Sequence, residues 1–238
     1  MAKILIIDDD IAICELVKIN LELQGHNCLY STDPTRGFAL IRQEQPNLVI
    51  LDVMMGAVNG FSVAQKIRAT NSISKTPIIM LTALGELNNK LEGFNSGVDD
   101  YITKPFEIEE LKARVLALLN RTGGEIASLR VKEILSKGDI TLIPESYSVQ
   151  ILDKKTQLTP IEFEILNVLI QNEGSMVSSK VLLKEVWGYE EDDDIDTIRV
   201  HITHLRSKIN KISNEKNRYI KTIYGGGYRL LADGVENK

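Results

Sequence analysis

The chain has 238 residues, of which 43% are hydrophobic and 26% charged, and its formal net charge is −5. This length favours two domains of ordinary size, and the net acidity argues against a uniformly basic nucleic-acid-binding protein. No apolar run is long enough to span a bilayer, and the apolar stretch 4–7 is too short for a signal peptide. We therefore expect a cytoplasmic protein that has no membrane partner. Cys14 and Cys28 lack C-x-x-C spacing and are interpreted as small hydrophobic residues in a reducing compartment.

Short apolar runs alternate with helical patterns from residue 3 to about residue 120. The predicted strands are residues 3–7, 27–30, 47–51, 77–81 and 100–103. The predicted helices are residues 11–24, 35–43, 60–69, 87–96 and 107–119. Continuous apolar strands that alternate with helices indicate a parallel sheet covered on both faces. Residues 1–120 are therefore predicted to form a doubly wound (βα)5 domain of the α/β class.

The second half of the chain has a different pattern. Residues 121–136 are expected to be a linker, and residues 137–235 a second domain. Short antiparallel strands are predicted at 140–142, 148–152 and 157–158, and helices at 159–174, 178–188 and about 194–212. Thr159 and Pro160 are a typical cap and first residue of a helix. A hairpin over 218–231, which turns at the three glycines 225–227, completes this half.

Polar side chains stand at the ends of several predicted strands. Ligands of doubly wound sheets bind at the carboxyl ends of the strands, where this chain carries Asp8, Asp9, Asp52, Thr82 and Lys104. Each of them alone is more simply explained as a turn or cap residue, which is the role we expect for Asp10. Together, three carboxylates with one ammonium and one hydroxyl suit Mg²⁺ and a phosphoryl group. Asp52, on a central strand, is the best candidate for a carboxylate that accepts the phosphoryl group.

A basic tract lies inside this acidic chain. Residues 199–229 contain eight basic residues and a single acidic one, Glu215. The predicted helix in this tract has an apolar stripe, which alone is typical of an ordinary surface helix. A basic hairpin with three tyrosines follows the helix, and a helix with an adjacent β-wing is a common DNA-binding arrangement. The stripe consists of Ile195, Ile198, Ile202, Leu205 and Ile209.

The strings IIDDD, LVILDVMM, IIMLTA and DDYITKPF resemble the receiver domain of two-component response regulators over residues 2–120. The resemblance implies a flavodoxin-like fold in which Asp52 accepts phosphate from a histidine kinase. It also implies a magnesium site formed by Asp8, Asp9, Asp52 and the backbone carbonyl of Met54. The remaining implied residues are Thr82 and Lys104, which contact the phosphoryl group, and Tyr101, the aromatic switch residue.

Three positions of the first half depart from the family pattern. The usual Met-Pro after the phosphoacceptor is Met55-Gly56 here, and we expect the loss of proline to loosen the loop that carries the metal-binding carbonyl. Family members form homodimers when phosphorylated. The resemblance places Lys90, Asp100, Glu110 and Arg114 at positions of the intermolecular ion pairs, while Asn95 and Leu116 replace another pair.

The segment LTPIEFEIL…LLKEVWGY…DTIRVHITHLRSKI…YIKTIYGGGYRL resembles the winged-helix DNA-binding domain of the OmpR/PhoB family. The resemblance implies double-stranded promoter DNA as partner, with Arg199, Val200 and His204 near bases. It implies that a second set contacts phosphates or positions the helix: Thr197, His201, Thr203, Arg206, Thr222 and Tyr228. Thr203, His204 and Tyr224 replace arginines of many relatives, so we expect a shallower salt dependence of DNA binding. Tyr224 remains in the predicted DNA-binding set, as a residue of the wing.

Three further interpretations remain at the level of the sequence. The acidic loop from Glu190 to Asp194 lies where this family contacts RNA polymerase, although a solvated loop is equally compatible with it. A haloacid-dehalogenase-type phosphatase would use Asp8 and Asp10 but leaves Asp52 without a role. A DNA-binding protein that dimerises without phosphorylation is kept open by Gly56. The strings KLEGFNSGVDDYITKPFEIEE and KEVWGYEEDDDIDTIRVHITHLR are similar to a cyanobacterial subgroup of the family that serves circadian output.

Overall fold

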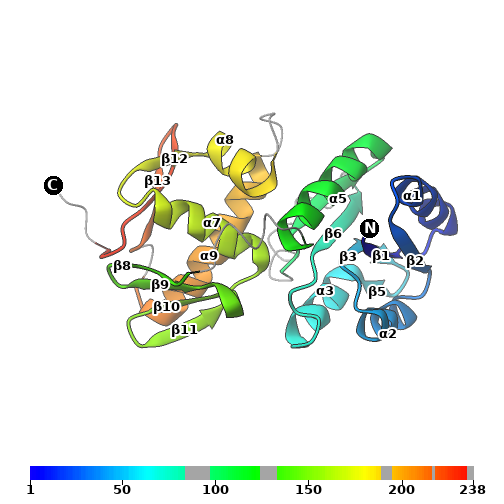
Figure 1. The fold of residues 1–238 in the computed structure, drawn as a ribbon, viewed down its shortest axis with the longest axis horizontal. Coiled ribbons are helices and arrows are strands. Elements are labelled where there is room, and N and C mark those ends of the chain that lie inside the picture. The colour runs from blue at the N-terminus through cyan, green and yellow to red at the C-terminus, as the bar shows by residue number, and fades with distance from the viewer. Residues whose placement is uncertain (84–96, 124–132, 189–194, 216–217, 235–238) are drawn as a thin grey trace. The chain divides into compact units, whose positions relative to one another are not determined.

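The computed structural model describes residues 1–83, 97–123, 133–188, 195–215 and 218–234. The side chains of residues 121–123 and 195–196 are outside this description. The chain divides into two compact units, Met1–Ala127 and Ser128–Lys238 (Figure 1). Each unit has its own sheet and its own buried core, so we describe them one at a time.

The first unit is built on a five-stranded parallel sheet with the order β2-β1-β3-β6-β7. The strands are β1 (Lys3–Ile7), β2 (Asn27–Ser31), β3 (Leu48–Asp52), β6 (Ile78–Ala83) and β7 (Asp100–Lys104). The apolar residues of β1 from Ile4 onward and all of β3 are buried, as expected for strands covered on both faces. The five predicted strands are thereby confirmed, each within two residues of its expected bounds.

Helices cover both faces of this sheet. They are α1 (Ile11–Leu23), α2 (Pro34–Glu44), α3 (Gly60–Ala69) and α5 (Ile108–Gly123). Figure 1 shows α1 and α5 on one side of the sheet and α2 and α3 on the other, and each pair is in contact. Asp10 caps α1 as predicted, because its side chain accepts a hydrogen bond from the Ala12 backbone N–H. The helix predicted at 87–96 lies outside the described residues.

The second unit begins with a four-stranded antiparallel sheet of order β11-β10-β9-β8. Its strands are β8 (Leu135–Lys137), β9 (Ile140–Ile143), β10 (Ser148–Ile151) and β11 (Lys154–Gln157). The expected linker overlaps with β8, because Leu135 and Ser136 pair with Leu142 and Thr141 of β9. It also overlaps with α5, which continues to Gly123.

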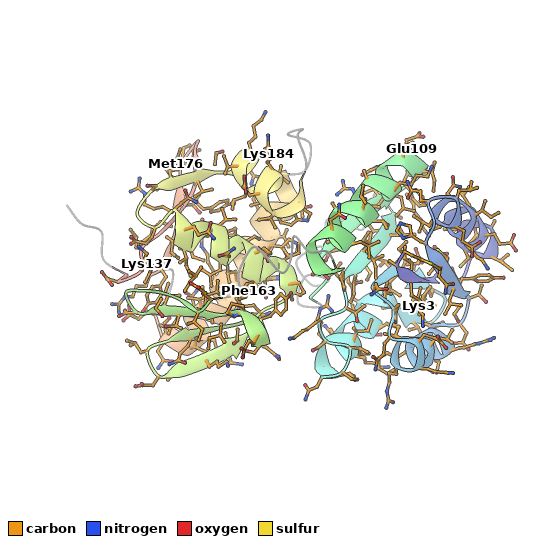
Figure 2. All side chains as sticks on the ribbon, in the orientation of Figure 1. Lys3, Glu109, Lys137, Phe163, Met176 and Lys184 are labelled. Atoms are coloured by element: carbon orange, nitrogen blue, oxygen red, sulfur yellow. The ribbon has the colours of Figure 1, made fainter. Side chains whose placement is uncertain are left out.

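Three helical segments and a small sheet complete the second unit. They are α7 (Pro160–Gln171), α8 (Ser179–Leu182) with a π-helical continuation Leu183–Trp187, and α9 (Ile195–Ser213). Strands β12 (Met176–Ser178), β13 (Ile220–Ile223) and β14 (Gly227–Leu230) form the sheet of order β12-β14-β13. Thr159 and Glu162 form a capping box at the start of α7. Figure 2 shows Phe163 of this helix inside the unit, where it is buried, and Lys184 at the surface.

The buried side of α9 follows the predicted apolar stripe. Ile198, Ile202, Leu205 and Ile209 are all buried, and α9 contacts α7. The side chain of Ile195, the first residue of the stripe, is outside the description. Among the described residues, none of the helices combines the length and the apolar character that a membrane crossing requires.

Candidate functional site

The predicted polar residues of the first unit meet at one edge of its sheet. Asp8 directly follows β1, Asp52 ends β3 and Lys104 ends β7. The parallel register places Asp52 opposite Leu81 and Lys104 opposite Ala83, so Thr82 of β6 lies between these two strand ends. Four strands that lie far apart in the sequence thus bring their carboxyl ends together, as the topology predicts.

Lys104 connects two of the carboxylates directly. Its ammonium group donates hydrogen bonds to Asp52 Oδ1 at 2.6 Å and to Asp8 Oδ2 at 2.7 Å. The second oxygen of Asp52 accepts a hydrogen bond from the Met54 backbone N–H at 2.9 Å. The second oxygen of Asp8 accepts one from the Asp10 backbone N–H at 3.0 Å. Both carboxylates are therefore fixed in orientation, and both are buried.

Burial dominates the electrostatics of this pocket. Burial raises the pKa of Asp52 above its ordinary value and the charge of Asp8 adds to this, while the hydrogen bond from Lys104 opposes it. Burial alone would lower the pKa of Lys104, but its hydrogen bonds to Asp52 and Asp8 raise that pKa above the ordinary lysine value. Lys104 therefore stays an ammonium group at neutral pH.

The pocket carries more negative than positive charge. One carboxylate oxygen each of Asp8, Asp9 and Asp52 lies within 4.8 Å of the others. Asp8 and Asp52 are buried and Asp9 is exposed, so the cluster opens to solvent on one side. Three carboxylates around one ammonium leave an excess of two negative charges. This donor set fits a hard divalent cation such as Mg²⁺, which takes oxygen ligands and keeps several waters.

Two residues that were not predicted from the sequence lie against the backbone of the pocket residues Asp52 and Asp8. A Cβ atom on Gly60 would come within 2.0 Å of the Asp52 carbonyl oxygen, so the first turn of α3 can approach β3 only because this residue is glycine. The Cys14 thiol donates to the Asp8 carbonyl oxygen at 3.3 Å. The cap residue Asn59 before Gly60 was a signal for the helix start, but neither contact can be read from sequence spacing.

The predicted switch and dimer residues are placed on β7 and α5. Tyr101 is buried and is the second residue of β7. Arg114 donates to Asp100 Oδ1 at 2.9 Å and forms a salt bridge with Glu110 at 2.8 Å, both within the same chain. Leu116 is exposed on α5. Lys90 and Asn95 lie outside the described residues.

Two of the residues predicted to contact phosphates or to position the helix are buried in the structure. His201 is only 2% exposed, and its ring packs on the buried Trp187 with 5.5 Å between the centroids. Its side chain therefore belongs to the core and cannot reach a phosphate from this position. Thr197 is buried in the same way. Both residues hold α9 in place, which is the second of the two roles that the resemblance allowed for them.

Arg206 joins α9 to the hairpin of β13 and β14. Its guanidinium donates to the Ile220 carbonyl oxygen at 3.1 Å and to Thr222 Oγ1 at 2.8 Å. It also lies over the ring of the buried Tyr228, 5.8 Å from the centroid. Arg206, Thr222 and Tyr228 thus connect the helix to the hairpin in the free protein.

The outward side of α9 carries the other predicted base and phosphate contacts. Arg199 and Thr203 are exposed, whereas Val200 and His204 are half-buried. The Thr203 hydroxyl donates to the Arg199 carbonyl oxygen at 2.7 Å, so its oxygen can still act as an acceptor. Burial, and then the charge of Lys208, lower the pKa of His204 to about 4. Tyr224 is fully exposed at the hairpin turn, and the acidic loop 190–194 lies outside the described residues.

Fold and site together define a class of protein: a doubly wound domain with an acidic pocket, followed by a winged helix. Comparison with known proteins gives the same answer. A model of the response regulator receiver domain matches residues 4–116, and one of the C-terminal domain of transcriptional regulatory proteins matches residues 153–230. The chain therefore belongs to the OmpR/PhoB-type response regulators. Such a protein regulates transcription in response to phosphorylation, and its family implies a sensor histidine kinase and promoter DNA as partners.

Individual relatives match along nearly the whole chain. The DNA-binding dual master transcriptional regulator RpaA of Synechocystis sp. is 49% identical over 97% of this chain and 95% of that protein. The alkaline phosphatase synthesis transcriptional regulatory protein PhoP of Bacillus subtilis is 36% identical over 96% of both chains. Among solved structures, a RitR mutant (C128S) superimposes with a TM-score of 0.76 at 24% identity, over 97% of this chain and 99% of that one. That likeness supports the fold.

Proposed function

We propose that Asp52 is the phosphoacceptor of this regulator. One observation carries the proposal: the buried Asp52 carboxylate is held at one oxygen by Lys104 and at the other by the Met54 amide, with Asp8 and Asp9 beside it. An oxygen of Asp52 attacks the phosphorus of the kinase phosphohistidine. The phosphorus–nitrogen bond breaks, the imidazole leaves with its electron pair, and an acyl phosphate forms on Asp52. Hydrolysis of this acyl phosphate by water, at the same pocket, returns the carboxylate.

The neighbouring residues position the reacting groups and balance their charge. Asp8, Asp9, Asp52 and the Met54 carbonyl would hold Mg²⁺, which supplies charge neutralisation for the transferred group when bound. Lys104 remains charged and moves its hydrogen bonds from the free carboxylate to a phosphoryl oxygen. Thr82 offers a hydroxyl to another phosphoryl oxygen. Phosphorylation would draw Thr82 toward the phosphoryl group, and Tyr101 of β7 would then turn inward.

The exposed side of α1 is proposed as the surface that receives the kinase. Leu16, Ile19 and Leu23 are 51%, 58% and 81% exposed, and their spacing places them on one stripe of the helix. The helix begins directly beside the pocket, because Asp10 is its cap. An apolar helix of the partner can pack on this stripe while its phosphohistidine reaches Asp52.

We further propose that residues 1–120 are the receiver domain and residues 137–235 the DNA-binding domain, with the segment 121–136 between them sharing residues with the end of α5 and the start of β8. Arg199, Val200, Thr203 and His204 would face the DNA from α9, and Thr222 and Tyr224 from the hairpin. Arg206 and Tyr228 hold the two parts together. Phosphorylation would favour a homodimer through Lys90, Asp100, Glu110 and Arg114, and the acidic loop from Glu190 to Asp194 would contact RNA polymerase. A role in circadian output stays a prediction from the sequence.

The proposal is tested by mass spectrometry of the intact protein and of its peptides after incubation with Mg²⁺ and acetyl phosphate. We expect one phosphoryl adduct on Asp52 in the wild type and none in Asp52→Asn. Asp33→Asn is the matched control, since Asp33 caps α2 and is not part of the pocket. An adduct on Asp8 would instead support the phosphatase interpretation. A wild type that takes no phosphoryl group from either acetyl phosphate or a phosphorylated kinase would overturn the proposal.

A further inference from the structure

The loop after Asp52 forms a small hairpin, although we expected it to be loosened by the loss of proline. Strand β4 (Met54–Met55) pairs with β5 (Val58–Asn59), with Met54 opposite Asn59 and Met55 opposite Val58. Gly56 and Ala57 are the two residues of the turn. A two-residue connection of this kind fixes the register of the strands that it joins.

The backbone of Gly56 determines which turn this is. Gly56 has φ = 56°, and Ala57 is absent from the residues with positive φ. A positive φ at the first central residue alone is the mark of a type II′ turn, whose twist suits a hairpin. A proline at the same position has φ near −65° and fits the first position of a type II turn, the mirror image. The turn observed at Gly56 is therefore of the hand opposite to the one that proline fits, and the expectation of a looser loop stays a prediction.

Hydrogen bonds connect both ends of this hairpin to Asp52 and to the residue that follows it. At one end, the Met54 N–H donates to Asp52 Oδ2 at 2.9 Å. At the other end, the Gly60 N–H donates to the Val53 carbonyl oxygen at 2.8 Å, and Asn59 caps α3 through Phe61 N–H. The turn thus closes a short loop whose two ends are fixed, so a turn of defined geometry is needed to hold the Met54 backbone groups in one orientation.

We propose that Gly56 is a positioning residue that directs the Met54 carbonyl to the cation site and the Met54 amide to Asp52. This inference rests on the proposed magnesium site. No atom lies within 4 Å of a Cβ built on Gly56, so a side chain there meets no steric obstacle. The requirement for glycine is in the backbone dihedral angle alone, and this makes the role testable by changing the turn and not the packing.

The test compares the full chain with Gly56→Pro, the double variant Gly56→Pro/Ala57→Gly and, as control, Ala57→Gly. The measurements are Mg²⁺ affinity by isothermal titration calorimetry, without a phosphoryl donor, and urea unfolding followed by circular dichroism. We expect Gly56→Pro to weaken Mg²⁺ binding about tenfold or more, because it forbids the observed φ. The double variant, whose Pro-Gly sequence suits a type II turn, should return to within about threefold of the wild type. Ala57→Gly should bind like the wild type.

The outcomes separate this inference from the proposed function. A Gly56→Pro protein that binds Mg²⁺ as the wild type does would overturn the role of the turn and leave the site standing. A double variant as weak as the single one, although folded, would also overturn it. If Gly56→Pro does not fold, the Mg²⁺ affinity of Gly56→Ala is measured in its place. We expect this affinity to be severalfold weaker than that of the wild type, because alanine adopts a positive φ at a smaller free-energy cost than proline. A wild type that binds no Mg²⁺ would overturn the metal site itself, and this role with it.

Discussion

At the scale of single residues, Lys104 balances part of the negative charge of the receiver pocket. Its one positive charge faces two buried carboxylates at hydrogen-bonding distance. Removal of one partner of a buried ion pair lowers the stability of the fold by far more than the intact pair contributes to it, because the other charge stays buried without a partner. The same lysine is proposed to contact the phosphoryl group, so its structural and chemical roles have to be separated by experiment.

Lys104→Met should lower the free energy of unfolding by roughly 2 kcal/mol at pH 7.5 without divalent cations. The loss should shrink toward acid pH, because burial already raises the pKa of Asp52 and its protonation removes one of the charges left behind. It should also shrink when Mg²⁺ is added, since the cation replaces the missing positive charge. Urea unfolding at pH 7.5 and 5 measures both effects.

Lys112→Met is the matched control for this prediction, because Lys112 pairs with the exposed Glu109 on the surface of α5. Surface pairs contribute little, so the control should lose less than about 0.5 kcal/mol at either pH. A Lys104→Met protein whose loss is equal at both pH values and unaffected by Mg²⁺ would contradict the assignment.

His204 is the second residue with a defined electrostatic consequence. Because its pKa is lowered to about 4, it is neutral at both pH 7.5 and pH 6 and adds no cation to the DNA-binding surface. The slope of log affinity against log salt should therefore be the same at the two pH values in the wild type. His204→Arg should make that slope steeper by about 0.9, the value for one further phosphate contact. Fluorescence anisotropy with duplex DNA at four salt concentrations measures the slope.

His204→Gln is the control, which keeps a neutral hydrogen-bonding side chain and should preserve the slope. A wild-type slope that steepens between pH 7.5 and pH 6 would show that His204 is protonated in this range, against the prediction.

Much of the pocket could be predicted from the sequence, and the reasons are local. Asp8, Asp52, Thr82 and Lys104 stand at strand ends, and a parallel sheet brings strand ends together whatever the sequence distance. The sequence left two roles open for His201, because its helix presents polar residues on several faces, and only packing against Trp187 shows that this side chain is buried. The contact of Gly60 with the Asp52 carbonyl depends on the approach of α3 to β3, which no spacing reveals.

At the scale of secondary-structure elements, α1 combines two functions on opposite sides. Its buried residues Cys14, Val17 and Leu21 pack on the sheet. Its exposed residues Leu16, Ile19 and Leu23 form the apolar stripe proposed for the kinase. Sequence periodicity predicted the helix, but a helix that is apolar on both sides reads as a fully buried one. The burial of each residue is therefore needed to recognise the exposed stripe.

Leu16→Lys/Ile19→Lys should slow phosphotransfer from a phosphorylated histidine kinase at least about tenfold, through loss of the apolar contact. Phosphorylation by acetyl phosphate should stay unchanged, because this small donor needs the pocket and not the stripe. Leu152→Lys, an exposed apolar residue of the second unit, is the control. Autoradiography of the receiver band over time gives both rates, and equal slowing with both donors would contradict the docking role.

At the scale of the whole molecule, the proposed dimer has to compete with contacts inside each chain. Arg114 already pairs with Asp100 and Glu110 of its own chain. Ion pairs formed between two copies would then replace existing ones, and their net gain is small. If phosphorylation promotes dimerisation as proposed, most of the gain in free energy would therefore have to come from the shape of the dimer surface. Two tethered winged helices would then gain affinity for repeated half-sites.

Phosphorylation should lower the dimer dissociation constant at least about tenfold, a typical allosteric coupling, and raised salt should change this ratio little. Glu110→Gln removes only one of the two partners of Arg114. The ratio of its dissociation constants without and with phosphorylation should therefore stay within about threefold of the wild-type ratio. Sedimentation velocity with and without acetyl phosphate, using Asp52→Asn as the unphosphorylated control, measures it. Equal dimer content in both states would count against phosphorylation-dependent dimerisation.

The hydrogen bonds of Arg206 to the hairpin have a consequence for how target sites can diverge. Arg206 joins α9 to the hairpin through Thr222 and Ile220 before any DNA is bound. The distance between α9 and the hairpin is therefore already set in the free protein. If α9 and the hairpin contact DNA as proposed, exchange of Arg199 or His204 would change which bases are preferred and leave the spacing between the helix and hairpin contacts unchanged. A relative with the same contacts of Arg206 would thus be able to prefer different bases in its half-site while the length of the half-site stays the same.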